Sequence, residues 1–218
     1  MDVQRIIQEI NRHMNGPVSE SLTQRGFSYK VNYGVSIPEL KNIAAQYNGN
    51  HELALALYEE DIRECKLIAS MIDDPKKVTG EQIDNWAESF NNHEIVEQVC
   101  SNLIWKADCA LSRSIEWCLS GDKYLQKAGL IIAARNASNT NIKDKIFIPY
   151  LDVIDGFDRE MFLQQKNPIE FALRQIANRN SSLKEKVLKL AQTFTASSDE
   201  NRAWVGAQLL FGFGGEEE

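Results

Sequence analysis

The sequence predicts an all-α protein, built as a superhelical stack of antiparallel helix pairs with a concave groove. Apolar residues recur at spacings of three and four residues, the period of an amphipathic helix, and no run alternates strictly as a half-buried strand does. Capping patterns mark many of the helix starts. About a dozen short helices joined by short turns favour stacked hairpins over a four-helix bundle, and the concave face of such a stack is its usual binding surface.

The predicted helices follow one another without a low-complexity linker. Several begin at a capping box, a Ser or Thr followed three residues later by Glu or Gln, and these boxes start at Ser36, Thr79, Ser182 and Ser197. Residues 1–211 are expected to form a single helical-repeat domain, followed by a flexible acidic tail at 212–218. In chain order, the predicted helices span residues 2–14, 17–25, 37–47, 50–59, 61–72, 80–90, 93–106, 109–119, 123–137, 142–154, 160–178, 182–195 and 199–211.

The composition excludes several classes of protein. The 218 residues carry a net charge of −7, and 43% of them are apolar, which is an ordinary globular balance and excludes wholesale disorder. No apolar run approaches the ~20 residues that a membrane-spanning helix needs, and the N-terminus lacks the features of a secretory signal. Four cysteines in a chain this long are not a disulfide framework, and no zinc-ligand spacing is complete. We expect a cytoplasmic protein without a metal or other cofactor.

The acidic balance is uneven along the chain. Residues 1–110 carry 10 basic and 17 acidic side chains, which gives −7, whereas residues 111–218 carry 14 of each. Within residues 123–189, 12 basic and 7 acidic side chains give +5. Because phosphate binding depends on local charge, this region can present a cationic face to a nucleic acid. The alternative is an ordinary solvated helix surface of mixed charge.

His93 and Glu97 form the most informative pair. They are four residues apart in the helix predicted at 93–106, so they stack on one side, at the margin of its apolar stripe. A carboxylate there can stabilise a developing positive charge or orient a water molecule. The alternative is a helix-start residue paired with a carboxylate one turn later, with Asn91 or Asn92 as the N-cap. The apolar stripe is formed by Ile95, Val96, Val99, Cys100 and Leu103.

Two further segments hold candidate groove residues. Lys127 begins an amphipathic helix and can reach a phosphate as a point charge, or it is an ordinary surface lysine. Phe171 lies within a basic helix in which Pro168 should cause a kink or a helix start. Its ring can offer an aromatic face to a groove, or it packs in the core. The basic residues of that segment are Lys166, Arg174 and Arg179.

Four segments together resemble the AlkD-type DNA alkylation repair family, the HEAT-like-repeat alkylpurine DNA glycosylases. Residues 34–44 resemble the family's G-[IV]-x-x-P-x-x-[RK]-x-[LI]-A stretch, and residues 90–100 its N-x-W-D-x-x-D-x-x segment. Residues 124–129 resemble its W-x-[QR]-R-x-A helix, and residues 171–180 the second part of its K-K-A-[IV]-x-W-A-L-R-x-[IY]-[GA]-K-x-N helix. The resemblance runs from about residue 34 to about residue 195. The order and spacing of the segments carry it, because no single motif is very specific.

The resemblance implies HEAT-like or ARM-type repeats whose basic groove holds duplex DNA by its backbone, without full extrusion of the damaged base. Members of the family remove cationic N3- and N7-alkylpurines by cleaving the N-glycosidic bond. Two tryptophans flank the sugar of the lesion, and an aspartate stabilises the developing oxocarbenium charge and positions water. By alignment, Glu97 stands at the aspartate position, and His93 and Phe171 stand at the tryptophan positions. Lys127 stands at a DNA-binding arginine, and the other expected DNA contacts are Lys166, Arg174 and Arg179.

All four aligned positions differ from the family pattern. Glu97 keeps the charge but moves the carboxylate by one methylene, and misplacement by about 1 Å can cost a hundredfold in rate. His93 and Phe171 offer less aromatic area, and Lys127 lacks the planar fork of arginine. Three functions therefore stay open: a DNA glycosylase that uses Glu97, a non-catalytic module that binds DNA, and a helical scaffold for a protein partner, which the acidic N-terminal half favours.

Overall fold

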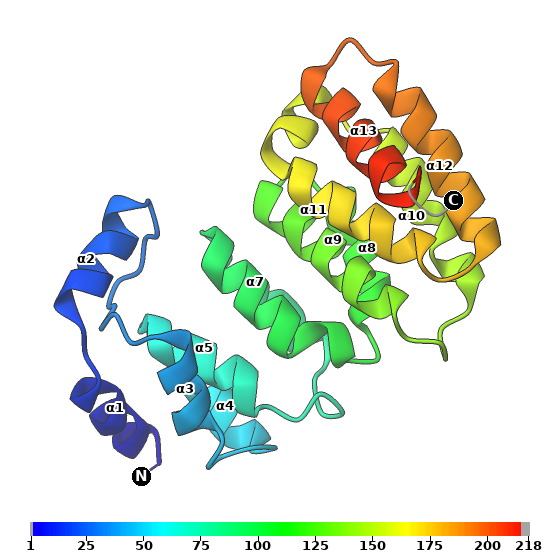
Figure 1. The fold of residues 1–218 in the computed structure, drawn as a ribbon. Coiled ribbons are helices and arrows are strands. Elements are labelled where there is room, and N and C mark those ends of the chain that lie inside the picture. Colours follow the sequence, from blue (N-terminus) through cyan, green and yellow to red (C-terminus); the bar gives the residue numbers. More distant parts are fainter. Residues whose placement is uncertain (1, 215–218) are drawn as a thin grey trace. The chain divides into compact units, whose positions relative to one another are not determined.

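The computed structural model describes residues 2–214, and most of them are helical (Figure 1). The described residues fall into two compact units, unit 1 within residues 1–110 and unit 2 within residues 111–218. Besides the isolated bridge between Val31 and Ile62, they contain no β-pairing. No helix among them is long and apolar enough to cross a membrane. The extent of the predicted domain, 1–211, stays a prediction.

The helix bounds follow the predicted series closely. Unit 1 holds α1 (Asp2–Arg12), α2 (Gly16–Gln24), α3 (Ile37–Ala44), α4 (His51–Tyr58), α5 (Arg63–Ile72), α6 (Gly80–Ala87), α7 (His93–Asn102) and the 3-10 turn η1 (Ile104–Lys106). Across the boundary and within unit 2 lie α8 (Ala110–Cys118), α9 (Lys123–Ala137), the 3-10 turn η2 (Asp144–Ile146), α10 (Ile148–Asp155), α11 (Arg159–Ala177), α12 (Ser181–Thr195) and α13 (Glu200–Gly214).

The helix starts confirm one of the predicted capping boxes in full and the N-cap of a second, and they correct the other two. Ser36 forms a full box with its Glu partner, and the Thr79 side chain accepts a hydrogen bond from the backbone N–H three residues on. At α12, however, the N-cap is Asn180, which lies two residues before Ser182. Before α13, Asp199 accepts the bond from Arg202 N–H. An amide or carboxylate oxygen nearer the helix start therefore takes the capping role from the predicted serines.

Helix α5 is central to unit 1, where it packs against α1, α3, α4 and α7 (Figure 1). Its N-terminal residue Arg63 is buried, with a side chain only 3% exposed. The guanidinium donates two bonds of 2.7 Å to the carboxylate of Glu94, one from Nε and one from Nη2. Its Nη1 donates to a carboxylate oxygen of Glu64 at 2.8 Å and to the carbonyl oxygen of Val35 at 3.0 Å. One buried cation thus joins α5, α7 and the extended segment before α3.

The same network holds the extended segment in place. The Glu64 carboxylate accepts hydrogen bonds from the backbone N–H groups of Tyr33 and Val35, both at 3.2 Å. The Tyr29 hydroxyl bonds to Glu94 at 2.8 Å and to Asn92 at 3.1 Å. Of the two N-cap candidates, Asn91 and Asn92, the structure selects Asn92 for α7, because its side chain accepts from the Ile95 backbone N–H. The start of α7 is therefore fixed by contacts to residues about thirty and sixty positions earlier in the chain.

Burial and pairing act against each other in this network. Burial raises the pKa of Glu94, but the hydrogen bond and the positive charge of Arg63 outweigh that effect and leave the pKa below its ordinary value. Burial, together with the Glu94 charge, raises the pKa of the Tyr29 hydroxyl. The phenol is therefore neutral and donates to an ionised carboxylate. A buried charge pair of this kind is costly to break, because either partner alone would remain desolvated.

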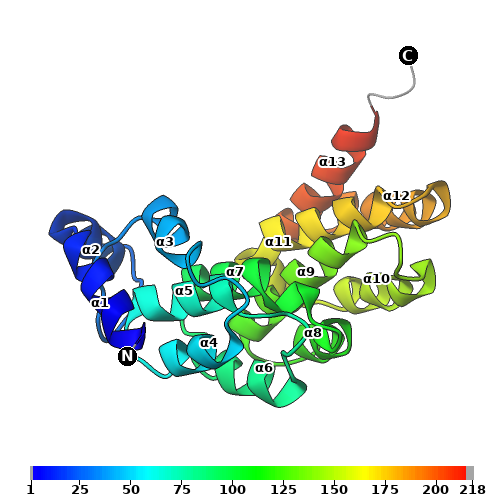
Figure 2. The ribbon, with the colours of Figure 1, turned by 90° about the horizontal axis from the view of Figure 1, so that it is seen from below.

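In unit 2, α11 packs against α9, α12 and α13 (Figures 1 and 2). Gly129 of α9 lets α8 approach closely. A Cβ atom at this position would lie 2.5 Å from the carbonyl oxygen of Ser114 and 2.6 Å from the sulfur of Cys118. Both distances are shorter than real Cβ contacts, so α8 and α9 fit together only with glycine there.

The break predicted near Pro168 lies within α11, three residues before the proline. Gln165 has non-helical dihedral angles, φ −125° and ψ 17°, and two helical segments meet there. A proline ring clashes with the carbonyl group four residues earlier, which explains why the helix breaks before residue 168. The buried Gln165 amide donates to the carbonyl oxygen of Lys123 at 2.9 Å and ties the break to the start of α9.

The C-terminal helix runs past the predicted start of the tail. Helix α13 ends at Gly214, so residues 212–214 are helical, whereas residues 215–218 of the predicted tail lie outside the described residues. Phe213 explains the extra turn, because its ring is buried beneath two cations. The Arg174 guanidinium lies 5.7 Å from the ring centre and the Lys184 ammonium lies 4.9 Å from it.

Substitution Gly129→Ala tests the close approach of α8 and α9. Glycine to alanine in an exposed helix interior stabilises a protein by up to about 1 kcal/mol. Here we expect the opposite sign, a loss of about 1–3 kcal/mol in the free energy of unfolding, because the new methyl group overlaps backbone and sulfur atoms. Urea denaturation measures the change. Gly121→Ala is the matched control, since nothing lies within 4 Å of its added Cβ; equal effects at both sites would contradict the packing argument.

Substitution Glu94→Gln tests the buried charge network. We expect a loss of about 3 kcal/mol in the free energy of unfolding at pH 7, because Arg63 would lose its bidentate carboxylate. Glu94 has a pKa below its ordinary value of 4.5. Its contribution is therefore full above that value and is lost as the pH falls through the pKa of the folded state. Denaturation at a series of pH values should show the two proteins converging in acid.

The control for this experiment is Glu97→Gln, on the same helix. Glu97 is exposed, and exposed charges contribute little to stability. We expect it to change the free energy of unfolding at pH 7 by less than about 1 kcal/mol. A loss of stability at Glu94 that does not change with pH would contradict the assigned role of its charge.

Candidate functional site

His93 and Glu97 lie one turn apart on α7, and both are exposed. The predicted apolar stripe of this helix is confirmed, since Ile95, Val96, Val99 and Cys100 are buried on its other side. The predicted helix 93–106 ends earlier, at Asn102, because Leu103 leaves the helical region with φ −124° and ψ −65°. The structure thus brings His93 and Glu97 together on one solvent-facing surface.

The group on this surface that can act chemically on a ligand is the Glu97 carboxylate. Glu97 projects from a helix whose start is fixed by Asn92 and by the Arg63–Glu94 pair, so its backbone position is well defined. A carboxylate held this way can stabilise a positive charge that develops beside it or orient a water molecule. The position of His93 one turn earlier adds a second polar side chain to the same surface.

Sequence reasoning missed the residues that support this surface. None of Glu94, Arg63, Glu64 and Tyr29 was singled out, and a carboxylate in the first turn of a helix, such as Glu94, is already explained by the helix dipole. One signal was available. Arg63 shares a helix face with Leu67, four residues later, so the apolar period of α5 continues through a charged residue. A charge within an apolar stripe requires a buried partner.

Lys127 lies elsewhere than expected. It is only 7% exposed, within a stretch of α9 that is buried on most sides. From this position the side chain offers little surface to a ligand, and its contact with a phosphate stays a prediction. The reason lies in the packing of α9 against α8 and α11, which leaves this helix little polar surface.

Phe171 lies on the part of α11 that follows the break at Gln165. Its side chain is 44% exposed, so the structure places it at the surface instead of in the core. Lys166, on the same part of the helix, has its ammonium group 5.1 Å from the centre of the Trp204 ring of α13. An exposed aromatic ring and a nearby stretch of polar helix surface can together contact a sugar or a base.

The two arginines of this region have structural partners. Arg174 forms an ion pair with Glu170 and donates to the carbonyl oxygen of Gln208 at 3.1 Å. Arg179 has a side chain only 6% exposed, and it donates to the carboxylate of Asp144. The remaining Arg179 donors are bonded to the carbonyl oxygens of Ala137, Asn139 and Ile142. Arg179 therefore secures the turn after α9, and its donors are already used within the protein.

The cations that face solvent in unit 2 are mainly lysines. Seven of the twelve basic residues between 123 and 189 are exposed: Lys123, Arg135, Lys143, Lys145, Arg159, Lys186 and Lys189. Lys143 and Lys145 lie in the turn that Arg179 secures. In the described part of the chain, no three His, Cys, Asp or Glu side chains gather as metal ligands would.

The comparisons with known proteins agree on fold and family. A family model described as DNA alkylation repair enzyme matches residues 6–199. The search of curated proteins gives no match. One solved structure, described as "a new family of proteins related to the HEAT-like repeat DNA glycosylases with affinity for branched DNA structures", matches with a TM-score of 0.75 at 19% identity. The match covers 97% of this chain and 95% of that chain.

The structural match confirms the predicted fold class of stacked helix pairs, and at this identity it shows the fold alone. The family model covers most of the chain, from α1 to the start of α13. The chain therefore belongs to the DNA alkylation repair enzyme family.

Proposed function

We propose that this protein is a DNA glycosylase that removes cationic N3- and N7-alkylpurines from duplex DNA, with Glu97 as the catalytic carboxylate. Cleavage of the N-glycosidic bond leaves positive charge on the sugar, and a nearby carboxylate lowers the energy of that state. A purine that is already cationic leaves readily, so little proton transfer is required of the protein. Membership of the family supports this class of chemistry.

The observation that carries the proposal is the exposure of Glu97 on a helix with a fixed start. A carboxylate that acts on a sugar must be reachable by DNA and must not shift when DNA binds. Glu97 meets the first requirement by its exposure. The Arg63–Glu94 pair and the Asn92 cap support the second, because they hold the first turn of α7.

The DNA backbone would be met by exposed lysines of unit 2. Lys143 and Lys145 supply two cations in a turn secured by Arg179, and Lys166 and the exposed ring of Phe171 add surface on α11. Lys127, Arg174 and Arg179 are left out of the proposed contacts, because they are buried or bonded within the protein.

A second function is DNA binding without base excision. His93 and Phe171 stand at the two positions where the family resemblance implies tryptophan, so the aromatic grip on the lesion's sugar is reduced at both. The structural relative is described as having affinity for branched DNA. A branched substrate would use the same backbone contacts and would need no catalytic carboxylate.

The excision of bases is tested with duplex DNA that carries N7-methylguanine. We expect release of the modified base by the unaltered protein and a loss of about 100-fold or more in Glu97→Gln, since the charge that stabilises the sugar is removed. Glu97→Asp should keep measurable activity, because it keeps the charge. The measurement is the rate of base release under single-turnover conditions.

The matched control is Glu20→Gln, which makes the same chemical change at an exposed carboxylate of α2. We expect it to leave the rate unchanged. If the unaltered protein releases no more base than Glu97→Gln, catalysis is excluded and binding without excision is the remaining function.

The DNA contacts are tested by the salt dependence of binding. Each phosphate neutralised by a lysine adds roughly 0.9 to the slope of log K against log salt. We expect the double substitution Lys143→Gln and Lys145→Gln to weaken duplex binding and to reduce the slope by about 1–2. The same change at Lys76 and Lys77 of unit 1, both exposed, should leave the slope unchanged. Fluorescence anisotropy measures the affinity, and a flat salt dependence for the unaltered protein would contradict any role of DNA.

A further inference from the structure

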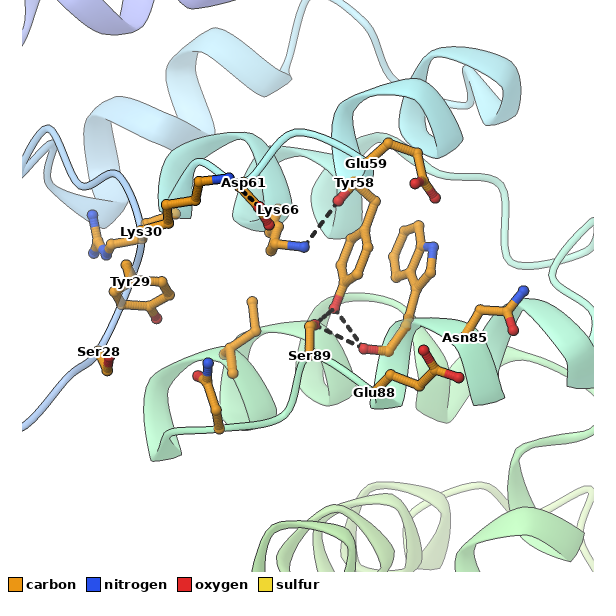
Figure 3. Close-up of a pocket in the computed structure, with 14 residues that line it drawn as sticks. Ser28, Tyr29, Lys30, Tyr58, Glu59, Asp61, Lys66, Asn85, Glu88 and Ser89 are labelled. Atoms are coloured by element: carbon orange, nitrogen blue, oxygen red, sulfur yellow. Dashed lines mark hydrogen bonds and ion pairs between the residues drawn. The ribbon is translucent and has the colours of Figure 1, made fainter.

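A pocket of about 560 Å³ opens in unit 1 (Figure 3), and neither His93 nor Glu97 lines it. It lies between the extended segment 28–30, the turn from α4 into α5 and the turn from α6 towards α7. The α7 residue that lines it is Ile95, which is on the other side of that helix from Glu97. The function proposed above makes no use of this pocket.

One wall of the pocket is a rigid aromatic pair. The rings of Tyr58 and Trp86 are stacked, with centres 3.8 Å apart and planes within 4° of each other. The Tyr58 hydroxyl donates to the Trp86 carbonyl oxygen at 3.0 Å and is also hydrogen-bonded to Ser89 at 2.7 Å. Both side chains are buried, so packing holds the two rings and the hydrogen bonds of the Tyr58 hydroxyl hold the edge of the Tyr58 ring.

The Lys66 ammonium group lies against the free face of this wall. Its nitrogen is 4.5 Å from the centre of the Tyr58 ring and donates a hydrogen bond of 3.0 Å to the Tyr58 carbonyl oxygen. Figure 3 shows Lys66 on the side of the Tyr58 ring that faces Tyr29 and away from Asn85. The side chain is half-buried, and burial lowers the pKa of Lys66 although Asp61 and Glu59 act in the opposite direction.

Lys66 has an unmet capacity to bind negative charge. Among the described residues no carboxylate lies within ion-pair distance of its nitrogen, because the Asp61 carboxylate is paired with Lys30 at 3.0 Å. An ammonium group has three donors, and the backbone bond and the ring contact occupy two of them. The third is available to a group in the pocket, and a partly desolvated cation binds an anion more strongly than one in water.

The remaining lining favours an anion attached to a flat polar group. Tyr29 lies on the same side of the Tyr58 ring as Lys66 (Figure 3), and Asn91 brings an amide group to the pocket lining, whereas Asn85 lies on the other side of the ring. Amides of this kind can donate to and accept from the edge of a base. The volume falls within the range of about 300–1,000 Å³ that is usual for small-molecule sites. Glu59 and Glu88 are exposed and lie on the opposite side of the Tyr58 ring from Lys66 (Figure 3).

We propose that this pocket binds a nucleotide through its phosphate monoester, with Lys66 as the phosphate contact. A phosphate monoester carries about −1.5 to −2 charges at neutral pH and has three acceptor oxygens. A carboxylate carries one charge and two oxygens, so a single lysine attracts the phosphate more strongly. Two sources share this chemistry, a free mononucleotide and the 5′-phosphorylated end of a DNA strand.

The test is a titration of the ¹⁵N-labelled full-length protein with dAMP, followed by NMR. We expect chemical-shift changes in the backbone amides of residues 28–30 and 58–66, half-complete at about 1 mM. Deoxyadenosine, which lacks the phosphate, should bind at least about 10-fold more weakly, because a hydrogen bond to a charged group is lost. No shift changes with dAMP up to about 10 mM, or equal binding of the two compounds, would overturn the proposal.

Three variants assign the binding to Lys66. Lys66→Met should weaken dAMP binding about 10-fold, whereas Lys66→Arg keeps the charge and should retain it. Lys77→Met removes an exposed lysine outside the pocket and should change nothing. If Lys66→Arg and Lys66→Met bind dAMP equally well, or if Lys66→Met binds as the unaltered protein does, Lys66 is not the phosphate contact and the proposal fails.

The source of the phosphate is decided by a second titration. A thymidine trinucleotide is added with and without a 5′-phosphate. Tighter binding of the phosphorylated strand than of dAMP identifies a strand end as the natural occupant, and weaker binding identifies a free nucleotide. Glu97→Gln should bind dAMP as the unaltered protein does. The nucleotide proposal and the proposed base excision are therefore tested independently, the first by dAMP binding and the second by base release.

Discussion

The bidentate pair between Arg63 and Glu94 is the interaction on which unit 1 depends. It joins the start of α5 to the start of α7, and through Glu64 and Tyr29 it also fixes the extended segment between α2 and α3. Hydrogen bonds to charged groups are strong only when both partners are desolvated together, and this geometry meets that condition. Both the exposed surface of α7 and the pocket beside Tyr58 and Lys66 are framed by residues that this network holds.

Local pattern predicted the helices well, because helix formation depends on neighbours three and four residues apart. The buried stripe of α7, its Asn92 cap and the break associated with Pro168 all follow from such short-range rules. The Arg63 network could not be predicted in the same way. Its members come from three segments separated by about thirty residues each, and only the folded chain shows that they meet.

The candidate site was predicted less well than the fold, and Lys127 shows why. Helix α9 is buried on most sides, so a helical-wheel projection finds no distinct polar face in it. The projection therefore cannot distinguish a buried lysine in such a helix from a lysine at the surface. The partners of Arg179 could not be predicted either. Its donors bond to backbone carbonyl oxygens at and after the end of α9, and every residue has such an oxygen, so no sequence pattern indicates the contact. His93 and Glu97 were easier, since their exposure at a helix surface follows from the helical period alone. The period left Phe171 open between the groove and the core, and the structure places it at the surface.

The difference between the buried pair and the exposed pair on α7 also bears on how such a sequence changes over evolutionary time. Arg63 and Glu94 cannot be exchanged one at a time without leaving a desolvated charge, so descendants of this chain should replace them jointly or keep both. His93 and Glu97 are exposed, so water can solvate what remains when one of them is exchanged. The exposed surface of α7 can therefore change one residue at a time, whereas the buried pair that supports it has to change as a unit. Such a protein can acquire a new chemistry at its surface and keep its fold.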